Sequence, residues 1–253
     1  MPTAAALRFE IERTLEHRIP AALTPKPQGI YELSPCGIPP VDALLDGGLP
    51  LGAISEITGP ESSGRTSLAL SFLAQQTSMG QVCAWVDVND ALDPESAAAS
   101  GVCLRQLLWV RCKGAHTGAN GRPWARLDQA LRAADLILQT AGFTATVLDL
   151  GSTAAEYANR IPLTMWFRFR QAAERSRTSV LVLGRRSYAH SSAALVLECQ
   201  RLRGAPVGET VLSSFCFEVR RQRQRFPQTL SINRKAPAST WSASVAWDLV
   251  RRA

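Results

Sequence analysis

The chain has 253 residues, of which 46% are hydrophobic and 19% are charged, and its formal net charge is +7. This composition excludes an intrinsically disordered or fibrous chain, and the length suits one α/β domain with appendages. No apolar run approaches the roughly 18 residues of a membrane span, and the polar N-terminus excludes a signal peptide, so we expect a cytoplasmic protein with no membrane contact. The six cysteines have no C-x-x-C spacing, which argues for reduced core residues and against a disulfide scaffold or a zinc site.

The ends of the chain differ from its middle. Residues 3–18 carry apolar residues at four-residue spacing, which predicts an amphipathic helix, and a proline-rich linker follows. We therefore expect an N-terminal helix and linker arm (1–36), a core (37–235) and a C-terminal tail (236–253). In the tail, Trp241, Val245 and Leu249 have the same four-residue spacing, which predicts a short helix for binding a partner or for packing on the domain.

The most specific motif is the octet Gly-Pro-Glu-Ser-Ser-Gly-Arg-Thr at residues 59–66. It matches the phosphate-binding pattern G-x-x-x-x-G-K-[ST] except that Arg65 stands in place of lysine. An apolar strand pattern at 53–58 precedes it and a helix pattern at 66–79 follows, so backbone N–H groups and a helix N-terminus would form an anion site. The alternative interpretation is an ordinary glycine- and serine-rich turn.

Strand and helix patterns then alternate along the chain. We predict strands at 82–88, 107–111, 143–149 and 179–183, separated by helices beginning near Pro94 and spanning 124–141 and 159–176. Two further strands, 194–202 and 211–220, follow without a helix between them. The pattern predicts an α/β fold with a mainly parallel sheet flanked by helices and antiparallel strands at its C-terminal end. The strand at 144–149 ends in Asp149, which places a carboxylate where a nucleotide-bound metal would lie.

Residues 37–70 (GIPPVDALLDGGLPLGAISEITGPESSGRTSLAL) and 86–94 (VDVNDALDP) resemble the RecA recombinase family. The hexapeptide Gly59-Pro-Glu-Ser-Ser-Gly64 is close to diagnostic, and the second segment is similar to the family pattern D-A-E-H-A-L-D-P. The resemblance extends over roughly 37–225 and is stronger in the first half. It implies a RecA-like P-loop NTPase core that binds ATP and Mg²⁺.

The resemblance also implies roles for individual residues. The phosphates would be wrapped by the backbone of Gly59, Pro60, Glu61, Ser62, Ser63 and Gly64. Thr66 would offer its hydroxyl to Mg²⁺, and Asp149 would support the metal through water. Asp93 lies where the family contacts the adenine.

Three positions depart from the family at the groups that perform hydrolysis. Arg65 replaces the lysine that reaches the β- and γ-phosphates, and arginine is not a conservative substitute because its guanidinium is planar and bidentate. Asn89 stands at the position of the catalytic glutamate, and an amide cannot act as a general base. Gly184 stands where the family places a glutamine that senses the γ-phosphate. We expect weak or lost ATP hydrolysis.

This combination of a retained phosphate loop and altered catalytic positions resembles the ImuA-type accessory proteins of bacterial mutagenic DNA repair. The resemblance implies a role in SOS-type mutagenesis as an ATP- and DNA-binding assembly module, with self-association or an error-prone polymerase as its partner. The alternative interpretation is an active DNA-dependent ATPase recombinase that catalyses strand pairing.

Positive charge is concentrated in one part of the chain. Residues 160–225 hold 13 arginines against 4 glutamates, whereas residues 1–159 hold 11 basic and 16 acidic residues. Such a field attracts the phosphate backbone of DNA, here expected to be single-stranded. We predict contacts from Arg185 and Arg186, near Tyr188 and His190, and from Arg221 and Arg223. The alternative is a solvated surface in an arginine-rich chain, because only 3 of the 28 basic residues are lysine.

Overall fold

The structure is a computed structural model that describes residues 31–112, 123–202, 214–225 and 238–244, all within one compact unit, Tyr31–Ala253. The helix predicted for residues 3–18 lies outside the described residues, as do Val245 and Leu249 of the tail.

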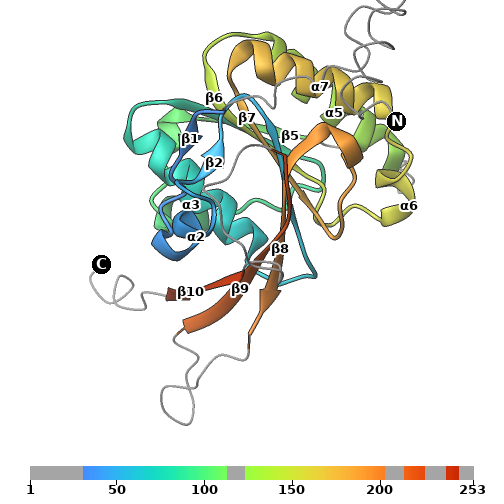
Figure 1. The fold of residues 1–253 in the computed structure, drawn as a ribbon. Helices are drawn as coiled ribbons and strands as arrows, with labels where there is room; N and C mark the ends of the chain where they lie inside the picture. Colours follow the sequence, from blue (N-terminus) through green and yellow to red (C-terminus); the bar gives the residue numbers. More distant parts are fainter. Residues whose placement is uncertain (1–30, 113–122, 203–213, 226–237, 245–253) are drawn as a thin grey trace, which may run out of the picture. The chain divides into compact units, whose positions relative to one another are not determined.

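An eight-stranded sheet forms the centre of this unit (Figure 1). Its strands are, in spatial order, β10 (Ala238–Ser244), β9 (Ser214–Gln224), β8 (Ala193–Arg201), β3 (Ile54–Thr58), β7 (Ser179–Gly184), β6 (Phe143–Asp149), β4 (Val82–Asp87) and β5 (Leu107–Arg111). The six strands from β8 to β5 run parallel, while β9 and β10 are antiparallel additions. Because the carboxyl ends of the parallel strands share one edge, the residues that follow them converge there.

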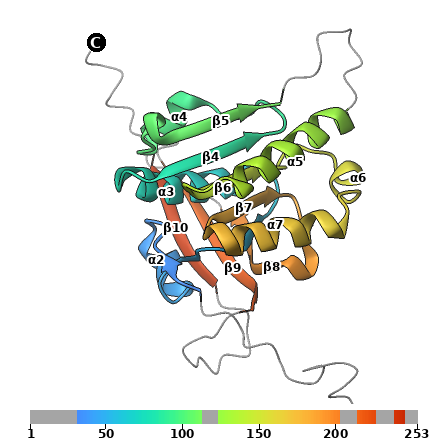
Figure 2. The same ribbon diagram turned by 90° about the horizontal axis from the view of Figure 1, so that it is seen from above.

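Helices cover both faces of the sheet (Figures 1 and 2). On one face lie α2 (Pro39–Leu44) and α3 (Arg65–Ser78), and on the other lie α5 (Pro123–Gln139) and α7 (Leu163–Ser176). Each layer buries its own apolar core, with Phe72 and Trp85 in the first and Trp166 and Phe169 in the second. Strands β3 and β7 are buried along their whole length because helices cover them on both sides.

The smaller elements connect these layers. They are β1 (Leu33–Ser34), β2 (Leu49–Pro50), α4 (Pro94–Ala99), η1 (Leu104–Gln106), α6 (Ala155–Ala158) and η2 (His190–Ser192). The predicted helix at 159–176 instead begins at Leu163, because Pro162 disfavours a helical conformation for the residue before it and serves as the extended N-cap. The predicted α/β fold, with a mainly parallel sheet and antiparallel C-terminal strands, is confirmed.

The helix predicted for the tail is wrong at Trp241. Residues 238–244 form β10, an edge strand that pairs with β9 over its whole length. Trp241 is 8% exposed while its neighbours Thr240 and Ser242 are exposed, which is the alternation of a strand. Its ring lies 5.0 Å from that of Phe217 on β9. The open edge of β9 and the apolar surface beneath it override the local helical spacing.

All six cysteines are free thiols, and four of them are buried. Over the stretches that the structure describes, no helix combines the length and the apolar character needed to cross a bilayer.

Candidate functional site

The octet at 59–66 forms a tight loop between the end of β3 and the start of α3. The N–H of Gly59 donates a hydrogen bond to the carbonyl of Gly184 at 3.2 Å, which ties the loop to β7. A β-carbon on Gly59 would lie 2.3 Å from the carbonyl oxygen of Cys199, so only glycine fits against β8. Gly64 adopts a left-handed conformation (φ +89°) and begins α3. The unpaired N–H groups at the start of the 14-residue helix α3 therefore point into the space enclosed by the loop.

Arg65, the residue that departs from the phosphate-loop pattern, is buried beneath the loop. Only 9% of it is exposed, and its Nη1 atom has no hydrogen-bond partner among the described residues. Burial lowers the pKa of Arg65, and the charge of Asp149 opposes this effect. A β-carbon on Gly151 would lie 3.4 Å from both Nη atoms, so the absence of a side chain at Gly151 makes room for the guanidinium.

Asp149 lies at the carboxyl end of β6, as the strand pattern predicts. Its Oδ1 accepts a hydrogen bond from the N–H of Gly151 at 2.9 Å, and burial raises the pKa of its carboxyl. A β-carbon on Gly151 would be 3.0 Å from Oδ1 of Asp149, so this carboxylate and the Arg65 guanidinium border the same small volume.

A cavity of about 270 Å³ lies between α3 and the ends of β4 and β6. It is lined by Arg65, Thr66, Leu70, Trp85, Ala91, Leu92, Asp93, Ser96, Asp149, Gly151, Ser152 and Leu183. The structure thus brings together Thr66, Asp93 and Asp149, which lie far apart in the sequence. Asp93 caps α4: its carboxylate accepts hydrogen bonds from the N–H groups of Glu95 and Ser96 and from the Ser96 hydroxyl. These hydrogen bonds lower the pKa of Asp93.

The oxygen donors of this cavity suit Mg²⁺. Within the described ranges, no three His, Cys, Asp or Glu side chains are grouped to hold a metal ion by themselves. Thr66 is exposed, and Thr66 and Asp149 both line this cavity. A hard cation that takes one or two protein oxygens and completes its shell with phosphate oxygens and water fits this donor set.

Asn89 lies just beyond β4, in a segment positioned by Asp87. The fully buried carboxylate of Asp87 accepts hydrogen bonds from the N–H groups of Ala91 and Leu92 and from the Trp109 indole. Asn89 donates to the hydroxyl of Thr153 at 3.2 Å. The adjacent Asp90 pairs with Arg111 on β5, at 2.5 Å and 2.6 Å, so its carboxylate is engaged in an ion pair. The amide at position 89 thus bridges two loops.

Gly184 ends β7 in a confined position. A β-carbon there would lie 2.7 Å from a ring carbon of Tyr188 and 2.9 Å from the carbonyl oxygen of Arg186. Buried Glu56 on β3 holds this turn by accepting hydrogen bonds from the Ser187 hydroxyl and from the N–H groups of Tyr188 (2.5 Å) and Ala189 (2.8 Å). A longer side chain at position 184 requires the turn to rearrange.

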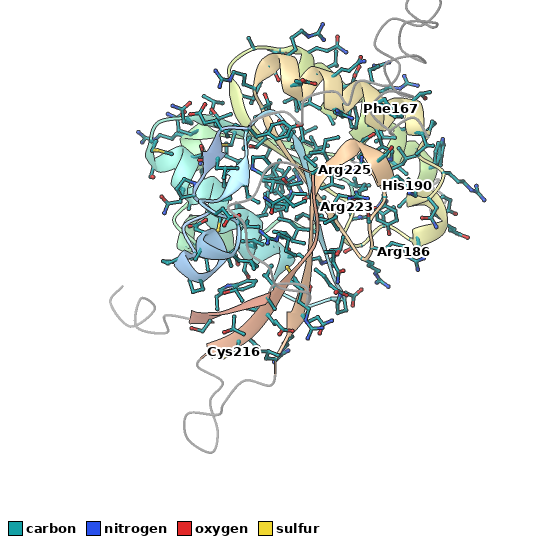
Figure 3. All side chains as sticks on the ribbon, in the orientation of Figure 1. Phe167, Arg186, His190, Cys216, Arg223 and Arg225 are labelled. Atoms are coloured by element: carbon teal, nitrogen blue, oxygen red, sulfur yellow. The ribbon has the colours of Figure 1, made fainter. Side chains whose placement is uncertain are left out.

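The turn after β7 presents its arginines and hides its aromatic ring. Arg185 forms an ion pair with Glu61 of the phosphate loop, and Arg186 is exposed. Tyr188 is only 2% exposed, so the expected combination of exposed arginines with this aromatic ring is not present. Figure 3 shows Arg186, His190, Arg223 and Arg225 along the side of the sheet that carries η2.

Arg221 and Arg223, both predicted to contact DNA phosphates, lie on different faces of β9. The register of β9 against β8 shifts between Val196 and Leu197, so the two arginines point to opposite faces. Arg221 is 8% exposed and donates to the carbonyl of Leu44 on the α2 side at 2.9 Å. Arg223 donates to the carbonyl of His190 on the η2 side. Because Arg221 is buried among protein partners, it is not available as a phosphate contact in this conformation.

A second cavity, of about 260 Å³, lies on the other side of the phosphate loop, and the sequence interpretation did not find it. Residues 62–67 line it from α3 and the loop, and Arg201, Phe215 and Phe217 line it from β8 and β9. The guanidinium of Arg201 lies over the ring of Phe215, 4.5 Å from its centroid. The only sequence signal was that both residues lie on strands predicted to pair as a hairpin.

Known proteins are similar to this chain in both sequence and fold. The model of the RecA N-terminal domain matches residues 24–154, just over half of the chain. RecA of Pseudomonas fluorescens is 43% identical over 107 residues, and RecA of Ruegeria pomeroyi is 42% identical over the same length. Each alignment covers 42% of this chain and 27% of the relative. The crystal structure of the RadB recombinase superposes with a TM-score of 0.56 at 17% identity, covering 78% of this chain and 93% of that one.

The matched region contains the phosphate loop, the segment from Asn89 to Asp93 and Asp149. The superposition on RadB extends the likeness of the fold beyond that region. The chain belongs to the RecA N-terminal domain family and is a divergent member of the RecA superfamily.

Proposed function

We propose that this protein binds ATP and DNA in bacterial DNA repair of the SOS-mutagenesis kind, as a cytoplasmic binding and assembly module with weak or lost ATP hydrolysis. The observation that carries the proposal is the contrast between the loop and its surroundings. The loop keeps its glycines and its helix N-terminus, whereas the general-base position holds an amide and position 184 has no space for a side chain.

Binding would rest on the backbone of the loop. The N–H groups at the start of α3 would hold the phosphates, and Thr66 and Asp149 would hold Mg²⁺. When bound, that ion would neutralise phosphate charge. Arg65 carries an unpartnered N–H group at the edge of the cavity, and a phosphate oxygen would satisfy it if the side chain moved slightly.

Asn89 would limit ATP hydrolysis at the step in which the attacking water loses its proton. Hydrolysis needs a group that accepts the proton of the attacking water, and such a base typically contributes 10²–10⁴-fold to the rate. The carboxamide of Asn89 cannot do so, and the neighbouring carboxylate of Asp90 is engaged with Arg111. The proposal therefore places nucleotide binding, without efficient turnover, at this site.

Binding and turnover must be measured separately to test the proposal. We expect the purified full chain to bind ATP and ADP, and to hydrolyse ATP slowly with no stimulation by single-stranded DNA. Robust DNA-stimulated turnover would instead establish the alternative, an active DNA-dependent ATPase recombinase. Failure to bind any adenine nucleotide would refute the assignment of the loop.

A second experiment restores the family's residues at two of these positions and measures whether ATP turnover rises. Arg65→Lys combined with Asn89→Glu should raise turnover by at least about tenfold, because a general base is restored. Thr153→Val is a matched control, since it removes the hydrogen bond of Asn89 without adding a base. An equal rise in the control would mean that release of Asn89, not the base, is responsible.

DNA and a protein partner follow from the charge distribution and from the ends of the chain. The arginine-rich part of the chain would attract a single strand mainly through its phosphates, with Arg185 and Arg186 as exposed contacts. A second copy of the chain or an error-prone polymerase would be the protein partner, with residues 1–30 as an arm that reaches it. Pull-down by the full chain and by a chain lacking residues 1–30 tests the arm, and identical capture by both would exclude it.

A further inference from the structure

The phosphate loop lies between two small cavities with different linings. The cavities measure about 260 Å³ and 270 Å³, and Arg65 and Thr66 border both. Each is below the roughly 300 Å³ at which sites for whole drug-sized ligands begin. A nucleotide whose phosphates are held by the loop can extend its base into either of these two cavities, which both border the loop.

The cavity on the α4 side offers little to a planar base. Its only aromatic residue, Trp85, is fully buried, so its ring cannot be reached. The carboxylate of Asp93 already accepts three hydrogen bonds as the cap of α4. Its exposed residues are the polar Thr66, Asp93, Ser96 and Ser152 and the small Ala91, so it presents no accessible aromatic ring, and its polar groups suit the metal and the terminal phosphate.

The cavity on the β9 side differs in having an accessible aromatic ring and a guanidinium in its lining. Arg201 is exposed at the end of β8, and its guanidinium lies 4.5 Å from the centroid of the Phe215 ring at the start of β9. Phe217 continues this apolar surface, with its ring 6.3 Å from that of Phe215 and nearly parallel to it. A guanidinium held flat on an aromatic ring presents a planar, weakly hydrated surface on which another flat ring can stack.

We propose that the nucleotide base stacks on Arg201, with Phe215 behind it, while the phosphates occupy the loop. This inference rests on the proposed nucleotide binding and names its base-binding site. It moves the base from the vicinity of Asp93 to the hairpin formed by β8 and β9, and it makes Arg201 and Phe215 the residues that distinguish a nucleotide from inorganic polyphosphate.

The test compares two ligands that share the phosphates and differ in the base. Affinities for ADP and for inorganic pyrophosphate are measured on the full chain by calorimetry. Stacking of one base is worth about 1–3 kcal/mol, so Arg201→Lys and Phe215→Ala should each weaken ADP binding by roughly 5- to 150-fold. Pyrophosphate affinity should change by less than about twofold, because lysine keeps the charge and phenylalanine contacts no phosphate.

Matched controls lie away from this cavity. Arg220→Lys changes an exposed arginine of β9 that pairs with Glu218, and Phe167→Ala removes a half-exposed ring from α7 on the other side of the sheet (Figure 3). Both controls should leave ADP and pyrophosphate affinities unchanged. Arg201→Lys keeps the positive charge at an exposed position and removes only the planar group, so it remains informative if Phe215→Ala does not fold.

A spectroscopic variant gives a signal that does not depend on loss of binding. Phe215→Trp places an indole at the proposed site, and its fluorescence, taken as the difference from the parent chain, should be quenched by ADP and not by pyrophosphate. Equal quenching by both ligands, or by neither at saturation, would contradict stacking at this position.

The remaining outcomes are distinct. If the parent chain binds neither ligand, the phosphate-loop function itself fails. If it binds ADP and pyrophosphate equally tightly, the phosphate function stands and the base site is refuted. If Asp93→Ala abolishes the preference for ADP while Arg201→Lys does not, the base lies on the α4 side. If Arg201→Lys weakens only the binding of a single-stranded oligonucleotide, the surface belongs to DNA and the inference is overturned.

Discussion

Gly64 lies against the ring of Phe217, although the two residues are separated by more than 150 positions in the sequence. A β-carbon on Gly64 would lie 2.8 Å from Cδ1 of Phe217 and 3.1 Å from Cζ2 of Trp241. The last glycine of the phosphate loop is thus packed under the two antiparallel strands that complete the sheet. The shape of the loop depends on β9 and β10, because their side chains form the surface on which it rests.

The contact makes Gly64→Ala a stringent test of this dependence. The methyl group would both strain a left-handed residue and overpack Phe217, and overpacking alone typically costs about 1–3 kcal/mol. Gly80→Ala is the control, because Gly80 is also left-handed (φ +75°) but a β-carbon there would meet nothing within 4 Å. We expect Gly64→Ala to lower the free energy of unfolding by that extra amount in urea denaturation, and to weaken ADP binding. Equal destabilisation by both variants would mean that Phe217 yields without cost.

Trp241 should behave as a core residue. It is 8% exposed and packs on Phe217, so Trp241→Ala is expected to cost about 3–5 kcal/mol of unfolding free energy, as for other buried aromatic residues. Trp124→Ala, at a position 38% exposed on α5, should change stability by about 0.5 kcal/mol. Thermal denaturation of the two variants measures the difference. If the Trp241→Ala protein were as stable as the parent, Trp241 would not be a core residue, and the alternative that it binds a partner would be favoured.

DNA binding should depend on the exposed arginines and not on Arg221. If Arg185 and Arg186 each contact a phosphate of a single strand, replacing both with alanine should reduce the salt dependence of log K by roughly 0.7 per residue. Arg221→Ala should leave that slope unchanged and lower the thermal stability, because the buried Arg221 side chain loses its partly buried hydrogen bond to the carbonyl of Leu44. Titrations of a labelled oligonucleotide at several salt concentrations test both statements. A flatter slope for a fully stable Arg221→Ala protein would contradict the structural assignment.

The buried carboxyl of Asp149 predicts a loss of folding stability that depends on pH. Burial raises its folded-state pKa above the unfolded value of about 3.9. The favourable contribution of the protonated carboxyl to folding is therefore fully present below the unfolded-state pKa. It is lost as the pH rises through the folded-state pKa. Asp149→Asn keeps the acceptor for the Gly151 N–H without the charge.

Without nucleotide, Asp149→Asn should be more stable than the parent at pH 7, and the gain should vanish toward pH 4. Melting temperatures at a series of pH values measure this difference. A gain that is the same at all pH values would show that the carboxylate charge carries no penalty, and a loss at pH 7 would show that its ion pairing with Arg65 dominates.

Much of this molecule could be predicted from local sequence. The phosphate loop was predictable because its glycines, the preceding strand and the following helix are adjacent in the chain, and backbone geometry there depends on near neighbours. The alternation of strands and helices predicted a mainly parallel sheet, and a parallel sheet in turn brings Asn89, Asp149 and Gly184 to one edge.

Other features were decided by contacts between distant segments. The bulge between β8 and β9 placed Arg221 and Arg223 on opposite faces, and no local pattern encodes that register shift. Residues 238–244 form a strand because β9 offered an unpaired edge, although the spacing around Trp241 favoured a helix. Burial of Tyr188 and of Glu56, and the stacking of Arg201 on Phe215, likewise arose from packing across the sheet.

One physical cause separates the features that the local sequence predicts from those that depend on distant contacts. Turn geometry and helix starts follow from a few consecutive residues, so the sequence alone determined that this protein has a RecA-like core with a phosphate loop, and that Arg65, Asn89 and Gly184 depart from the family pattern. Which arginines are exposed, where an aromatic surface is open and what supports Gly64 depend on strand pairing between residues far apart in the chain. Those pairings form only when the whole sheet assembles, and the tertiary structure alone decided them.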